Sequence, residues 1–140
     1  MITCSRKITF EAAHRIVGHE GSCKFLHGHR YVCTFKFTSK ALDNLGRVID
    51  FSIIKDLVGK WIKENLDHNV ILWEKDKELI ASIEKCTNQK VFCLPNNPTV
   101  ENLTSYLLYD VCPKLFKDHI ADCIEITIEE TENSKSSVKI

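Results

Sequence analysis

The chain has 140 residues, of which 44% are hydrophobic and 27% are charged, as is typical of a single globular domain, here spanning residues 1–140. Its 19 basic and 19 acidic residues give a net charge of zero, which excludes the overall basic field of a general nucleic-acid binder. The first residues contain no continuous apolar segment, and no stretch approaches the length of a membrane span. We therefore expect a cytoplasmic protein with neither nucleic acid nor membrane as a partner.

The seven cysteines are an odd number and form no C-x-x-C pair, which indicates reduced thiols and no disulfide framework. Cys4, Cys33 and Cys112 follow the spacing of neighbouring apolar residues, so each is expected to be a small buried hydrophobe. Only Cys23 stands in a chemical context, four residues before a His-Gly-His sequence.

The first predicted strand has a buried face that ends on a histidine. Its apolar residues Ile8, Phe10 and Ala12 alternate with polar ones, as in a half-buried strand. His14 continues the parity of the apolar residues, so we expect its side chain on the buried face.

The second predicted strand begins with two histidines on alternate positions. The parity of His27 and His29 continues to the apolar residues Tyr31 and Phe35, whereas most positions of the other parity are polar. His27 and His29 are therefore also expected on the buried face.

Three histidines on buried strand faces are a suitable donor set for zinc. Zn²⁺ binds neutral imidazole nitrogens at about 2.0 to 2.1 Å, and three such ligands leave one position for water or substrate, as in catalytic sites. Two other interpretations stay open. In the first, the His-Gly-His turn is exposed to solvent and His14 is a hydrogen-bonded residue at the end of a strand. In the second, Cys23 is the fourth ligand of a closed structural site.

Two helices are predicted after these strands. Apolar residues repeat at helical spacing over residues 53–66, after a cap at Asp50 or Ser52, and over residues 98–116, with Thr99 as the cap. The second helix carries two apolar stripes, which is wider than one core face requires. This width indicates either contact with a partner or deep burial of the helix.

The other predicted elements are shorter. Residues 77–86 are expected to form a short helix, residues 91–94 a short extended piece, and residues 123–130 and 137–140 two final strands. Alternate isoleucines in the first of these strands place Glu130 on the buried side, where an unpaired carboxylate is costly. Glu130 is either a strand-end glutamate turned to solvent or a carboxylate that receives a ligand with two adjacent N–H donors.

Asp67-His68 directly follows the first predicted helix. A carboxylate beside an imidazole can fix its tautomer and allow it to transfer protons near neutral pH. As an isolated dipeptide this is a weak signal, but it adds a candidate for acid–base chemistry.

Six motifs, spread over nearly the whole chain, resemble those of one enzyme family in both composition and order. This is the family of 6-pyruvoyltetrahydropterin synthase and 6-carboxytetrahydropterin synthase. The motifs are Phe10-Glu11-Ala12-Ala13-His14, Cys23 with His27-Gly28-His29, Ile49-Asp50-Phe51, Leu66-Asp67-His68, Pro98-Thr99-x-Glu101-Asn102 and Glu129-Glu130-Thr131.

The resemblance implies the α+β tunnelling fold, in which a four-stranded antiparallel sheet carries two helices on one face, in the order ββααββ. The predicted elements agree with this order. The resemblance also implies a homo-oligomer with shared active sites, here a homohexamer built as a dimer of trimers.

The resemblance further implies roles for individual residues, with Zn²⁺ as the cofactor. The zinc ligands would be His14, His27 and His29. Cys23 would be the catalytic base, supported by Asp67 and His68 of a neighbouring subunit. Glu130 would anchor the pterin ring, and Glu101 would lie near the same pocket.

The activity implied is that of a zinc-dependent lyase acting on a pterin triphosphate. The three residues between Cys23 and His27 resemble the bacterial carboxy-type enzymes. We therefore expect conversion of 7,8-dihydroneopterin triphosphate to 6-carboxy-5,6,7,8-tetrahydropterin, acetaldehyde and triphosphate, on the route to deazapurine nucleosides such as queuosine. The alternatives are a 6-pyruvoyltetrahydropterin synthase and, from another class, a non-catalytic zinc or pterin-binding module.

Overall fold

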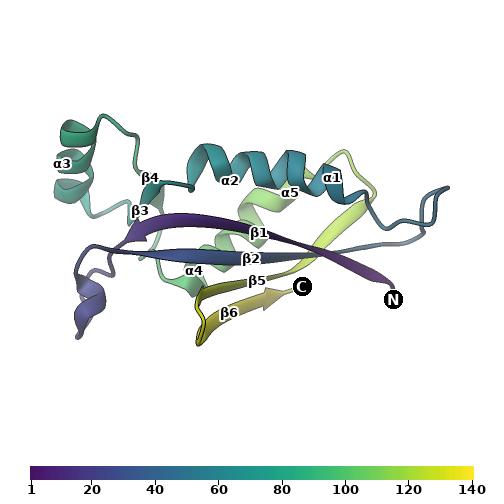
Figure 1. Cartoon of the computed structure of the whole chain (residues 1–140), viewed down its shortest axis with the longest axis horizontal. Coiled ribbons are helices and arrows are strands. Elements are labelled where there is room, and N and C mark those ends of the chain that lie inside the picture. The colour runs from purple at the N-terminus through teal and green to yellow at the C-terminus, as the bar shows by residue number, and fades with distance from the viewer.

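The computed structural model describes residues 1–140 and contains one six-stranded sheet, with strand order β4-β3-β1-β2-β5-β6 (Figure 1). The antiparallel part consists of β1 (Thr3–His14), β2 (His27–Ser39), β5 (Ala121–Thr131) and β6 (Ser134–Lys139). Next to β1, the sheet continues in parallel through β3 (Asn69–Trp73) and β4 (Phe92–Leu94).

The expectation of a four-stranded sheet is therefore wrong in the number of strands, although its antiparallel part is present. The additional strands β3 and β4 come from the segment between the two long helices, as does α3 (Lys77–Thr87), which matches the predicted short helix. Ile71 and Leu72 are adjacent in β3 and both buried. A strand buried on both faces lacks the polar–apolar alternation by which strands are recognised in a sequence.

The first long helix consists of α1 (Phe51–Ile54), a π-helical turn (Lys55–Gly59) and α2 (Lys60–Asn65). Asp50 caps it, because its carboxylate accepts a hydrogen bond of 2.8 Å from the amide of Ser52. The side chains that this helix and the residue after it bury in the core are Ile54, Val58, Ile62 and Leu66. They have the helical spacing that the sequence predicts.

The second long helix consists of α4 (Val100–Tyr106), a π-helical turn (Leu107–Val111) and α5 (Cys112–Leu115). The Thr99 hydroxyl caps it by accepting a hydrogen bond of 3.1 Å from the amide of Asn102. Pro113 lies in the first turn of α5. Because proline has no N–H to donate to the preceding turn, it accounts for the irregular turn there.

Both apolar stripes of the second helix are buried within the chain. Leu107 and Leu108 are 0% and 1% exposed, and the ring of Phe116 packs on that of Phe37 in β2 with centroids 4.7 Å apart. The width of the apolar surface thus reflects deep burial against the sheet, and it does not indicate contact with a partner.

The two long helices cover one face of the curved sheet, and the hydrophobic core lies between them and the sheet (Figure 1). Towards one end of the long strands, the ring of Phe10 stacks on that of Tyr31 with centroids 4.9 Å apart. The hydroxyl of Tyr31 lies 3.3 Å from Nδ1 of His14. The hydrophobic core therefore extends directly to the first histidine.

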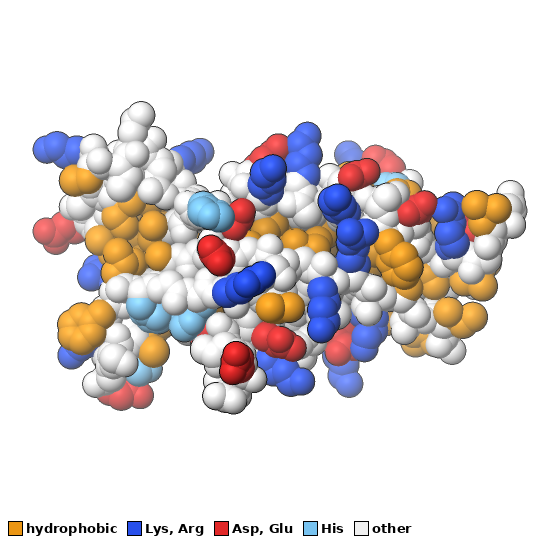
Figure 2. Space-filling view, viewed as in Figure 1, with side chains coloured by type: hydrophobic (Ala, Val, Ile, Leu, Met, Phe, Trp, Pro, Cys, Tyr) orange, Lys and Arg blue, Asp and Glu red, His pale blue; other side chains and the backbone are white.

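The molecular surface carries charges of both signs. Figure 2 shows lysine, arginine, aspartate and glutamate side chains interspersed on one face, without a continuous basic area on that face. None of the helices combines the length and apolar character needed to cross a bilayer.

Burial of the second helix can be tested by comparing two identical substitutions. Leu107→Ala should lower the free energy of unfolding by about 2 to 5 kcal/mol, because it leaves a cavity in the core. Leu45→Ala is the control, since Leu45 is 77% exposed in a turn. Urea unfolding followed by circular dichroism measures both, and equal losses would contradict the burial assigned to Leu107.

Candidate metal centre

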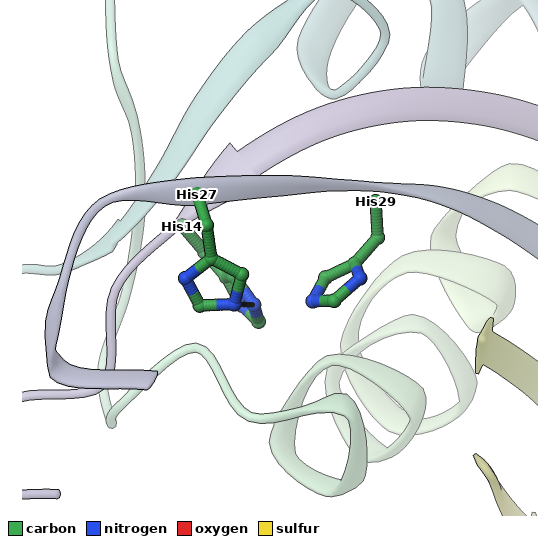
Figure 3. A group of neighbouring side chains, drawn as sticks. All are labelled: His14, His27 and His29. Atoms are coloured by element: carbon green, nitrogen blue, oxygen red, sulfur yellow. Dashed lines mark hydrogen bonds between the residues drawn. The ribbon is translucent and has the colours of Figure 1, made fainter. Parts of the chain in front are cut away.

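The register between β1 and β2 brings the three histidines together. His14 lies opposite His27, and Ala12 lies opposite His29, so the three histidine side chains leave the sheet on the same face. One nitrogen of each imidazole lies within 4.8 Å of the other two (Figure 3). Gly28 allows the close approach of the strands, since a Cβ there would lie 3.3 Å from the carbonyl oxygen of Ala12.

Backbone carbonyls fix the tautomers of two of these histidines. Nδ1 of His14 lies 2.8 Å from the carbonyl oxygen of Pro98, and Nδ1 of His27 lies 2.7 Å from that of Phe25. Because a carbonyl can only accept, each Nδ1 carries the proton. The Nε2 atoms of both rings therefore present lone pairs, as a metal ligand must.

The geometry of the facing lone pairs fits a bound cation. Nε2 of His14 and Nε2 of His27 are 3.1 Å apart, and two lone pairs at this distance repel each other unless a positive charge lies between them. Tetrahedral zinc with Zn–N bonds of about 2.05 Å would place its ligand nitrogens about 3.3 Å apart. The three imidazoles could therefore hold a metal ion.

Burial also favours the neutral form of two of these imidazoles, those of His14 and His29. It lowers the pKa of His14 to about 4, against a smaller opposing effect of its hydrogen bond to Pro98. Burial lowers the pKa of His29 too, and the nearby carboxylate of Glu130 opposes this shift. His14 is thus uncharged at neutral pH and ready to bind a metal without first losing a proton.

Glu130 lies beside the three histidines, on the buried side of β5 as its parity predicts. Its Oε1 is 3.5 Å from Nε2 of His14 and 3.6 Å from Nε2 of His29. It is not a member of the three-residue cluster. Its carboxylate therefore lies at the edge of the centre, where it can accept hydrogen bonds from a molecule bound there.

Cys23 lies on a short 3₁₀ turn (Ser22–Lys24) in the loop between β1 and β2 and is partly exposed. The turn is tied back to the strand end, because the carbonyl oxygen of Cys23 accepts a hydrogen bond of 2.9 Å from the amide of Ile16. The sulfur of Cys23 does not belong to the histidine cluster. This geometry weighs against a closed structural site with Cys23 as its fourth ligand.

Asp67 and His68 form a dyad that is fixed to β1. Oδ1 of Asp67 accepts a hydrogen bond of 3.0 Å from the amide of Glu11 and lies 3.0 Å from Nδ1 of His68. The amide of His68 donates to the carbonyl oxygen of Glu11 at 2.7 Å. Burial of Asp67 raises its pKa, but these hydrogen bonds outweigh that effect and the net pKa is lowered. Asp67 is therefore ionised at neutral pH and can orient the imidazole.

The dyad lies on the other face of β1 from the three histidines. Nε2 of His68 is 4.0 Å from the carboxylate of Glu11, and Glu11 is exposed whereas His14, of opposite parity, is buried. A single chain therefore does not bring His68 to its own metal centre. Glu101 is exposed on the first turn of α4, and its side chain makes no hydrogen bond or ion pair within the chain.

Comparison with known proteins decides the family. A profile of the 6-pyruvoyl tetrahydropterin synthase family matches residues 3–139. The chain belongs to this family. A 6-carboxy-5,6,7,8-tetrahydropterin synthase from Rickettsia felis is 47% identical over 133 residues, which are 95% of this chain and 96% of that protein. A protein of the same name from Haemophilus influenzae is 31% identical over 76% of this chain and 79% of its own.

Solved structures share the tunnelling fold of the family. An uncharacterized protein from Wolinella succinogenes has a TM-score of 0.81 at 19% identity, over 99% of this chain and 97% of that one. The 6-pyruvoyl tetrahydropterin synthase of Caenorhabditis elegans has a TM-score of 0.71 at 22% identity, over 99% and 95%. These likenesses concern the fold alone.

This member of the 6-pyruvoyl tetrahydropterin synthase family has an ion pair next to the first histidine that the sequence patterns do not predict. Arg15 donates from Nε and Nη2 to the two carboxylate oxygens of Asp76, at 2.7 and 2.5 Å, and Asp76 is buried. Asp76 precedes α3 and would be interpreted from sequence as its cap, but its side chain makes no capping bond. The pair joins the end of β1 to the segment that follows β3.

Metal analysis of purified variants tests the histidine cluster. His27→Ala and His29→Ala should each lose bound zinc, because removing one of three ligands leaves too few donors for tight binding. His119→Ala is the matched control, since His119 is exposed and outside the cluster. Retention of stoichiometric zinc by both cluster variants would refute the assignment, as would its loss from the control.

Proposed function

We propose that this chain is a zinc-dependent 6-carboxy-5,6,7,8-tetrahydropterin synthase. It converts 7,8-dihydroneopterin triphosphate and water to 6-carboxy-5,6,7,8-tetrahydropterin, acetaldehyde and triphosphate. The observation that carries the proposal is the 47% identity to the Rickettsia felis protein of that name over 95% of the chain. The short spacing between Cys23 and His27 supports the same product.

The three imidazoles hold the metal, which we propose to be zinc. The facing Nε2 atoms of His14 and His27 and the nearby ring of His29 suit zinc, which favours nitrogen ligands and leaves a fourth position for substrate. When bound, zinc acts as a Lewis acid towards the side-chain hydroxyls of the substrate and makes neighbouring protons easier to remove.

Cys23 is proposed as the base that takes such a proton. Its position outside the cluster leaves the sulfur free of the metal, and its partial exposure leaves it accessible to a substrate. A thiolate is the reactive form of cysteine, so proton transfer to Cys23 returns it to a thiol while the triphosphate leaves by elimination.

Glu130 is proposed to hold the pterin ring. An ionised carboxylate has only acceptors, and two adjacent N–H groups of a pterin are matching donors. Because its Oε1 lies within 3.6 Å of two of the histidine nitrogens, a ring bound to Glu130 would present its side chain to the metal. Glu101 is proposed to lie near the same pocket.

We propose that the active sites are shared within a homo-oligomer, a hexamer of two stacked trimers. The Asp67-His68 dyad faces away from the metal centre of its own chain, so it would serve that of a neighbour. Three strand edges have no neighbouring strand and are available for association, namely the outer edges of β4 and β6 and the edge of β1 over residues 3–10. A groove of about 720 Å³ beside β1 is lined in part by Asp67, and this open space next to the edge of β1 supports association of a second subunit there.

The decisive experiment is product analysis. Purified protein loaded with zinc and incubated with 7,8-dihydroneopterin triphosphate should release triphosphate and acetaldehyde and give a product with the mass of 6-carboxytetrahydropterin. Release of triphosphate without acetaldehyde, with all three side-chain carbons retained, would instead establish the 6-pyruvoyl reaction. Binding of the substrate without turnover would establish a pterin-binding module.

Cys23→Ala should keep the fold and the bound zinc but lose turnover. Removing a general base costs roughly 10² to 10⁴ in rate. Cys86→Ala serves as the control, because Cys86 is an exposed thiol on α3. Turnover of Cys23→Ala at the rate of Cys86→Ala would exclude the thiol mechanism, and joint loss of zinc would make Cys23 a ligand.

Shared active sites predict complementation between two inactive variants. A mixed assembly of Cys23→Ala and His68→Ala subunits contains some sites with an intact cysteine from one subunit and an intact dyad from the other. Exchange of subunits after mild dissociation should therefore restore part of the activity. A fully active monomer in sedimentation experiments would contradict sharing.

A further inference from the structure

The side chain of Asn97 makes a two-point contact with the loop that carries Cys23. The amide N–H of Val17 donates to Oδ1 of Asn97 at 2.9 Å, and Nδ2 of Asn97 donates to the carbonyl oxygen of Val17 at 2.9 Å. One carboxamide thus satisfies both backbone groups of one residue. Two such hydrogen bonds fix the orientation of the loop backbone at Val17 as well as its position.

The residue held in this way connects to both parts of the site. Val17 follows His14 by three residues, and the amide of its neighbour Ile16 donates to the carbonyl oxygen of Cys23 at 2.9 Å. The turn that carries Cys23 is therefore linked to Asn97 through two consecutive backbone residues.

The backbone next to Asn97 holds the first metal ligand. The carbonyl oxygen of Pro98 accepts from Nδ1 of His14 at 2.8 Å. The carbonyl oxygen of Asn97 accepts from the amide of Thr99 at 2.8 Å and from Nδ2 of Asn102 at 2.9 Å. The Asn97–Pro98 segment is thus fixed to the start of α4 and contacts both His14 and the Cys23 loop.

Polar contacts determine the position of this loop because it buries little apolar surface. Of its large apolar residues, Ile16 is partly buried, whereas Val17, Phe25 and Leu26 are 38%, 64% and 48% exposed. Two further polar contacts hold the ends of the loop. They are the ion pair of Arg15 with Asp76, next to His14, and the contact of the Phe25 carbonyl oxygen with Nδ1 of His27 at 2.7 Å.

We propose that Asn97 is a positioning residue that sets where the Cys23 sulfur stands relative to the three-histidine centre. Through Pro98 it also keeps the ring of His14 in its metal-binding orientation. The inference rests on the proposed function in taking Cys23 as the base and the three histidines as the metal ligands. The contacts that carry it are independent of any reaction.

The test compares Asn97→Ala and Asn97→Asp with Asn96→Ala. Asn96 is the exposed neighbour and makes no side-chain hydrogen bond. Asn97→Asp keeps the acceptor for the Val17 amide but places a carboxylate oxygen against the Val17 carbonyl, so it loses one of the two bonds.

Two measurements are made on each variant, namely zinc affinity by competition with a chelator and the rate of Cys23 alkylation by iodoacetamide in the metal-free protein. Alkylation is quantified by peptide mass spectrometry relative to the exposed Cys86.

We expect both Asn97 variants to bind zinc roughly tenfold or more weakly, as loss of a group that orients a metal ligand usually does. We also expect faster alkylation of Cys23 relative to Cys86, because a released loop opens locally. Asn96→Ala should match the wild type in both measurements. If Asn97→Ala does not fold, zinc affinity and Cys23 alkylation of Asn97→Asp alone test the proposal.

Two results would overturn the proposal. One is that both Asn97 variants equal Asn96→Ala in zinc affinity and in alkylation. The other is a lower melting temperature of the Asn97 variants with both measurements unchanged, which would reduce Asn97 to a contributor to stability. Neither measurement uses turnover, so a protein that forms no product would refute the proposed function and leave this inference standing.

Discussion

The antiparallel register of β1 and β2 is the constraint on which the rest of the site depends. It sets His14 opposite His27 and Ala12 opposite His29, so that all three imidazoles lie close together on one face. A slip of one residue would turn His27 and His29 to the opposite face of the sheet, because side chains alternate along a strand. The geometry of the candidate metal centre is therefore determined more by the strand pairing than by any loop.

The hydrophobic core supplies the energy that holds this register. Opposite pairs such as Phe10 with Tyr31 continue the histidine face into the interior, and Phe35 farther along β2 is fully buried. Burying each such side chain stabilises the fold by about 1.5 to 3 kcal/mol, and a slip would expose several at once. This stabilisation holds the Nε2 atoms of His14 and His27 close together, in an arrangement that a bound cation would favour.

The parts of the site that follow strand parity could be predicted from the sequence. Alternation alone placed His14, His27, His29 and Glu130 on the buried face, and the structure brings them within a few ångströms. The short strand β3 could not be found in this way, because it lacks alternation. The width of the second helix was equally ambiguous, since burial and partner contact require the same apolar residues.

Contacts between distant segments also could not be predicted from the sequence. Nothing in the residues around Arg15 indicates that Asp76, 61 positions later, will bind it. The same holds for Asn97, whose carboxamide meets Val17 only because β3 and β4 return the chain to the end of β1. Such polar contacts depend on the completed fold, whereas parity depends only on one strand.

The backbone of β1 fixes two chemical groups on opposite faces of one strand. Glu11 binds the amide of His68 and the carboxylate of Asp67, and His14 lies three residues farther along the same strand. His68 has a left-handed backbone, with φ of 57°, a conformation that costs free energy for a residue other than glycine. It persists because the bonds to Glu11 over-determine it. A strand is stiff over three residues, so the position of the dyad relative to the metal ligand is set within each chain. If subunits associate through the edge of β1, that same rigidity would fix the dyad of one subunit against the centre of the next.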